Sequence, residues 1–118
     1  QVASLLTGPY LQGCYLDWAQ RRRLQLDETA IRFFVLLAQH SLESRPQETL
    51  DYAQKGLELD PLSQECHLQR MQGFLKLGQP ENAVKQFAIC QRDLKKEVGL
   101  EPLTSLFEVF YRAKLALP

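Results

Sequence analysis

The sequence predicts an all-α fold, arranged as a tetratricopeptide-like right-handed stack of antiparallel helical hairpins with about five helices. Proline and glycine punctuate it at regular distances, at Asp60-Pro61, Gly78-Gln79-Pro80 and Gly99-Leu100-Glu101-Pro102. Proline is tolerated in the first turn of a helix and glycine just after the last. The segments between these marks have helical apolar spacing, and no stretch alternates apolar and polar residues as a strand does.

The first helix is expected over residues 17–42, after an irregular N-terminal segment over 1–16. One apolar stripe recurs with helical spacing at Ile31, Phe34, Val35, Ala38 and Leu42. A second stripe beside it consists of Ala30, Phe33 and Leu37. A helix that is apolar over so much of its girth is expected to be packed on both sides. The domain organisation predicted is therefore 1–16 irregular and 17–118 helical.

Four further helices are expected, each with a buried apolar face. The second starts at Pro46 and ends near Leu59, the third follows Asp60-Pro61, the fourth lies between Pro80 and Gly99, and the fifth begins at Pro102. The expected core residues are Leu50, Ala53 and Leu57, then Leu68, Met71 and Leu75, then Ala83, Phe87, Cys90 and Leu94, and finally Leu106, Phe110, Ala113 and Leu117.

The two central hairpins align with each other at an offset of 34 residues, which is the length of a tetratricopeptide repeat. Leu37 falls on Met71, Thr49 on Ala83, Ala53 on Phe87, and Gly56 on Cys90. The small residues Gly56, Ala83 and Cys90 would let neighbouring helices approach closely. The alternative is an unrelated helical bundle with a chance period.

Composition excludes several classes of function. The chain has 118 residues, with 14 basic and 14 acidic side chains, so a domain that grips nucleic acid by its own charge is not favoured. No apolar run approaches the length of a membrane span. Cys14, Cys66 and Cys90 lack ligand or CxxC spacing, which favours reduced thiols in a cytoplasmic protein, with Cys66 and Cys90 in the core. The chain starts without a methionine, and we expect it to be part of a longer protein.

No residue pattern indicates an enzyme, a cofactor or a metal site. His40 and His67 are isolated histidines, and there is neither a serine nucleophile elbow nor a glycine-rich phosphate loop. The candidates for partner contact are Arg21, Arg22, Arg23, Asn82 and Lys85. The arginine run is alternatively a solvated helix face, whereas Asn82 and Lys85 are residue types that would line a peptide groove.

Four motifs, in order, resemble the bacterial transcriptional activator domain, a tetratricopeptide-like module of antibiotic-regulatory-type (SARP-type) activators. They are Gly8-Pro9-Tyr10-Leu11 with Trp18-Ala19-Gln20-Arg21-Arg22-Arg23-Leu24; Leu57-Glu58-Leu59-Asp60-Pro61; Met71 with the run Gly78 to Phe87; and Glu97-Val98-Gly99-Leu100-Glu101-Pro102. The resemblance covers about residues 8–112.

The resemblance implies a non-enzymatic regulatory domain that acts beside a winged-helix DNA-binding domain, which this sequence does not contain. The implied partners are that DNA-binding domain, the transcription machinery or a second copy of the chain, and DNA is reached only through the missing domain. Leu5, Leu6 and Tyr10 would favour self-association as a homodimer. The alternative function is a generic tetratricopeptide adaptor that binds a protein or peptide.

Overall fold

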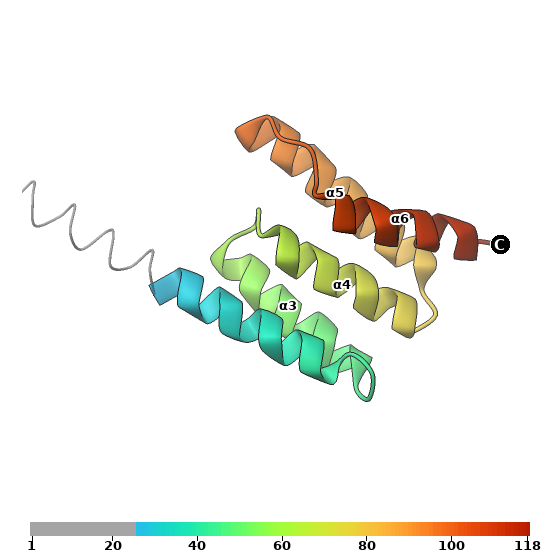
Figure 1. Ribbon diagram of the computed structural model, residues 1–118, viewed down its shortest axis with the longest axis horizontal. Helices are drawn as coiled ribbons and strands as arrows, with labels where there is room; N and C mark the ends of the chain where they lie inside the picture. Colours follow the sequence, from blue (N-terminus) through green and yellow to red (C-terminus); the bar gives the residue numbers. More distant parts are fainter. Residues whose placement is uncertain (1–25) are drawn as a thin grey trace, which may run out of the picture. The chain divides into compact units, whose positions relative to one another are not determined.

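The computed structural model describes residues 26–118, all of whose regular structure is helical (Figure 1). A helix over 26–41 is followed by α3 (Pro46–Leu59), α4 (Gln64–Lys76), α5 (Pro80–Val98) and α6 (Thr104–Ala116). The arrangement described below is that of the compact unit Ile31–Pro118. The prediction of an all-α fold is confirmed for these residues, whereas the expected irregular segment 1–16 and helical residues 17–25 lie outside the described residues.

Successive helices pack against one another, and α4 also contacts α6. The connections are short, so consecutive helices form antiparallel hairpins (Figure 1). Because α4 contacts α3, α5 and α6, it is central to the stack. Within residues 26–118 no helix is both long and apolar enough to cross a membrane.

The helix ends follow the predicted punctuation, with two shifts. Pro46 and Pro80 start α3 and α5, and Gly78 and Gly99 adopt left-handed φ values of 74° and 68° after α4 and α5. The first shift is that Pro61 lies in a turn before α4.

That turn has its own side-chain hydrogen bonds. The carboxylate of Asp60 accepts the Leu62 N–H at 3.0 Å, and the Ser63 hydroxyl caps α4 by accepting the Cys66 N–H at 3.4 Å. The helix therefore starts at Gln64 and not at the proline. The second shift is that α6 starts at Thr104, two residues after Pro102.

The larger apolar core lies between α4, α5 and α6. Its buried residues are Met71, Ala83, Phe87, Cys90, Leu94, Leu106, Val109 and Ala113. Phe87 is at its centre, stacked on Phe110 with a 4.3 Å centroid distance and edge-on to Phe107 at 5.1 Å. The stripe predicted for α5 is buried throughout, whereas Val109 was not among the predicted core residues.

A second, smaller core joins the helix over 26–41 to α3 and α4. Val35, Leu57 and Cys66 are buried together, with Ile31 packed against them. Small residues matter here, as predicted: a methyl group added at Gly56 would overlap the Cys66 sulfur. The second predicted stripe is not fully packed, since Phe33 is 58 % exposed.

Two buried hydroxyl groups hold the end of the first helix onto α3. Thr49 donates to the Ala38 carbonyl at 2.8 Å, and its oxygen lies 2.9 Å from the Ser41 hydroxyl. Ser41 also lies 3.0 Å from the Leu37 carbonyl. The hydroxyl groups of Ser41 and Thr49 therefore both have hydrogen-bond partners, as buried polar groups usually do.

The outer side of α6 is apolar. Leu103, Phe107, Tyr111 and Leu115 recur every four residues, and Leu103, Tyr111 and Leu115 are 53 %, 60 % and 86 % exposed. Leu100 in the preceding loop is also exposed. Exposed apolar surface of this kind is typical of contact surfaces.

Gly56→Ala is expected to lower the free energy of unfolding by about 2 kcal/mol, because overpacking a tight contact outweighs the helix propensity gained. Urea denaturation would measure it. Cys66→Ala removes the atom that the new methyl group meets, so adding it to Gly56→Ala should recover part of the loss. A Gly56→Ala variant as stable as the parent would contradict the close contact.

Candidate functional site

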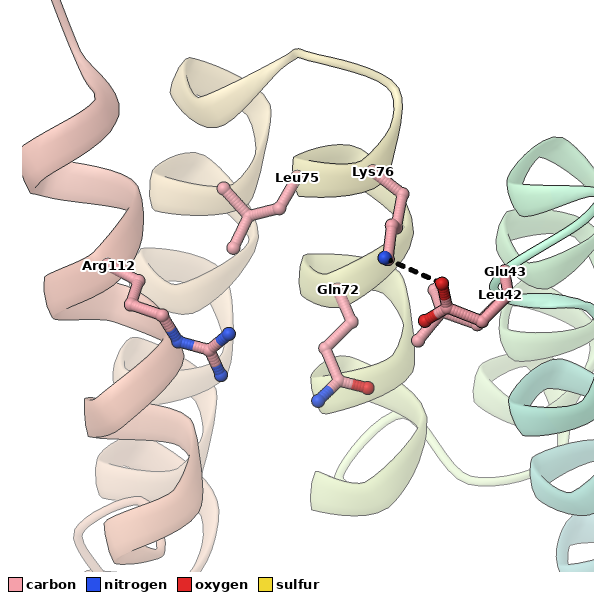
Figure 2. A pocket seen from close by; sticks show the side chains of 6 residues that line it. All are labelled: Leu42, Glu43, Gln72, Leu75, Lys76 and Arg112. Atoms are coloured by element: carbon pink, nitrogen blue, oxygen red, sulfur yellow. Dashed lines mark hydrogen bonds and ion pairs between the residues drawn. The ribbon is translucent and has the colours of Figure 1, made fainter.

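The helix over 26–41 and α3 form the first hairpin. A hollow of about 320 Å³ lies between the turn of this hairpin, α4 and α6 (Figure 2). We call it the groove; its lining residues are Leu42, Glu43, Gln72, Leu75, Lys76 and Arg112. Its volume is at the lower end of the roughly 300–1,000 Å³ usual for ligand pockets. It therefore has room for a few side chains of a partner.

Helix packing determines which residues line the groove. Gln72 and Lys76 are one turn apart on α4, and Arg112 lies on α6 next to the buried Ala113. Because α4 and α6 are in direct contact, the side chain of Arg112 extends toward Gln72 in the hollow (Figure 2). Leu42 and Glu43 come from the turn after the helix over 26–41.

The groove carries one positive charge that no neighbour neutralises. Lys76 Nζ is 2.9 Å from Glu43 Oε1, and the two side chains are 44 % and 78 % exposed, so this pair contributes little stability. Arg112, by contrast, makes no hydrogen bond or ion pair with any residue the structure describes. An unpaired guanidinium beside an amide and two leucines is suited to binding an anionic group on an otherwise apolar ligand.

Of the residues predicted for partner contact, the structure describes Asn82 and Lys85, and both lie outside the groove. Arg21, Arg22 and Arg23 are outside the described residues. Asn82 lies in the first turn of α5, where its amide donates to Gln79 Oε1 at 2.9 Å, and Lys85 is exposed one turn later. Neither lines the groove, and a partner contact at either stays a prediction.

Sequence reasoning missed the groove residues because they form no motif. Gln72 and Lys76 share one face of a helix, but Glu43 and Arg112 come from opposite ends of the described chain. The available signal was the 34-residue repeat. In this repeat the helix over 26–41 and α4 are each the first helix of a hairpin. The ends of these two helices would therefore flank one surface.

A second hollow, of about 360 Å³, lies at the turn before α4 and the end of α5. It is lined by three carboxylates, from Asp60, Asp93 and Glu97, together with Lys96, Pro61 and Leu62. The Asp60 carboxylate is already engaged in its turn. No set of His, Cys, Asp and Glu in the described part of the chain is grouped to hold a metal ion.

A chain of hydrogen bonds fixes the buried His67. Arg70 can only donate, so its bond to Gln86 Oε1, at 3.1 Å, assigns that atom as the acceptor. The Gln86 amide nitrogen must then donate to His67 Nδ1, at 2.7 Å. His67 Nε2 consequently carries the proton and donates to the Pro61 carbonyl at 2.9 Å.

This arrangement suits a neutral imidazole. Burial lowers the pKa of His67, although the bond to the Pro61 carbonyl acts in the opposite direction. Protonation would place an N–H against the Gln86 amide group, which is itself a donor. The network therefore joins α4 to α5, and through the Arg70 bond to the Leu50 carbonyl at 3.2 Å it reaches α3.

The two described cysteines have no feature of reactive thiols. Cys66 and Cys90 are fully buried and unpaired by disulfides. Burial raises the pKa of Cys66, and it raises the pKa of Cys90 to about 11. Both therefore stay protonated near neutral pH and serve as small core residues, as predicted.

Comparison with known protein families finds a match over most of the chain. The family model described as "Bacterial transcriptional activator domain" matches residues 1–112. No curated protein and no solved structure matches the chain.

The stability of the fold is expected to fall as the pH decreases from about 7.5 to 5.5. The pKa of His67 is lower in the folded state than its ordinary value of 6.5, so the unfolded chain binds more protons in this window. Thermal unfolding at several pH values would measure the change. His67→Gln should flatten this dependence, and His40→Gln, at an exposed position, should keep it; an equally steep slope in His67→Gln would contradict the assignment.

Proposed function

Because the chain belongs to the bacterial transcriptional activator domain family, a non-catalytic regulatory domain with a tetratricopeptide-like fold, we propose that it acts by binding protein. Its partner surface is the groove between the first hairpin, α4 and α6. It works beside a winged-helix DNA-binding domain, in the cytoplasm. The partner is that DNA-binding domain, the transcription machinery or a second copy of the chain.

The groove is the observation that carries this proposal. Its lining side chains come from α4, from α6 and from the turn after the helix over 26–41, and stacked hairpins commonly present such concave surfaces to proteins. Burial raises the pKa of both described cysteine thiols, Cys66 and Cys90, so neither is an activated nucleophile. The apolar outer side of α6 is a second surface that fits protein contact, including self-association.

A generic peptide-binding adaptor is the second candidate, and the same groove supports it. Two leucines and four polar side chains that converge on one hollow fit a short extended segment. The two functions differ in what depends on the groove. In an activator the groove must affect transcription, whereas in an adaptor it must only affect binding.

Filling the groove is expected to abolish transcription activation. With the complete gene expressed in the bacterium that encodes it, Gln72→Trp should lower the transcripts that depend on this activator by at least about tenfold, and RNA sequencing would measure them. Gln54→Trp introduces the same side chain at an exposed position of α3 and should have no effect. Normal transcripts with a folded Gln72→Trp protein would contradict the proposal.

The chain by itself is expected not to bind DNA, since 14 basic and 14 acidic residues leave no net charge to attract phosphates. A gel-shift assay with this chain and random-sequence duplex at low salt would test this. Binding that weakens with added salt would show that the DNA-reading part is not confined to another domain. Arg21→Gln, Arg22→Gln and Arg23→Gln together would then reveal whether the arginine run is responsible.

A further inference from the structure

We propose that the groove binds an extended peptide segment through one acidic side chain, Asp or Glu, flanked by apolar residues. The inference rests on the proposed function, because it names the partner chemistry of the same groove. The acidic side chain pairs with Arg112, and the flanking residues pack on Leu42 and Leu75.

The charge on Arg112 is the first reason. Its guanidinium is exposed and unpaired, and it points into the groove toward the Gln72 amide (Figure 2). Glu108, one turn earlier on α6, is exposed and forms no ion pair with it in the structure. A guanidinium can donate two parallel hydrogen bonds to one carboxylate, and the nearby amide can donate a third.

The Glu43–Lys76 pair is the second reason, because it limits how much negative charge the groove accepts. Lys76 is the other cation of the lining, and Glu43 neutralises it at 2.9 Å. The six lining residues thus carry a net charge of one positive unit. A carboxylate matches that charge, whereas a doubly charged phosphate would leave one negative charge facing Glu43.

The leucines are the third reason. Leu42 and Leu75 are half-buried and line opposite parts of the same hollow. Apolar side chains on either side of the acidic residue would remove this leucine surface from water. A free acetate or aspartate lacks those contacts, so a peptide is the occupant that uses the whole lining.

The test is a titration of the 118-residue chain with two probe peptides, acetyl-Ala-Leu-Glu-Leu-Ala-amide and its Gln counterpart. Amide chemical shifts in ¹⁵N-labelled protein would report both the dissociation constant and the location. The Glu peptide is expected to shift the signals of Gln72, Lys76 and Arg112, and to bind about tenfold more tightly than the Gln peptide, as expected for loss of charge-assisted hydrogen bonds.

Three variants sharpen the test. Arg112→Gln should weaken binding of the Glu peptide about tenfold. Glu43→Gln frees Lys76 as a second cation and should strengthen binding about threefold, within the range of exposed ion pairs. Lys114→Gln removes one positive charge from the same helix at a residue outside the groove, where its ammonium lies over the Phe110 ring, and should leave binding unchanged.

Four outcomes would overturn the inference: equal affinity for the two peptides, equal weakening by Arg112→Gln and Lys114→Gln, no shift in the groove at millimolar peptide, or a tighter response to inorganic phosphate than to the Glu peptide. Each leaves the proposed function standing if Gln72→Trp still abolishes transcription activation. Loss of the proposed function would appear instead as normal transcription in Gln72→Trp, whatever the peptides do.

Discussion

The close approach of α3 to α4 is the contact on which the rest of the fold depends. It is possible because Gly56 has no side chain where α4 presents the sulfur of Cys66. With α4 held against the first hairpin, its other sides are free to meet α5 and α6. The groove follows from this placement. Leu42 and Glu43 of the first hairpin form one of its sides, Arg112 of α6 forms the other, and α4 lies between them.

Apolar and polar contacts join the helices in different ways. The aromatic cluster around Phe87 fills the space between α5 and α6, where contact area matters more than direction. The bonds from Arg70 through Gln86 to His67 are directional, so they also fix how the helices are turned about their axes. Buried polar networks of this kind specify one arrangement when every member has a partner.

Much of the fold could be predicted from the sequence, since proline and glycine positions and apolar spacing are local signals. Pro46, Pro80, Gly78 and Gly99 mark helix ends in the structure as they do in the sequence. The start of α4 could not be read in the same way, because the cap by Ser63 competes with the more obvious Pro61. The exposure of Phe33 escaped prediction too, since periodicity does not show which neighbours a helix has.

The site was less predictable than the fold, and the reason is physical. Arg112 and Glu43 acquire their roles only when helices distant in sequence pack together.

The fixed tautomer of His67 has a consequence for the reactivity of its imidazole ring. Both ring nitrogens are already engaged, so this imidazole has no free lone pair for a metal, an electrophile or a proton in transit. The buried histidine offers no nucleophilic nitrogen to an acylating reagent, so it is a structural residue in chemical as well as spatial terms.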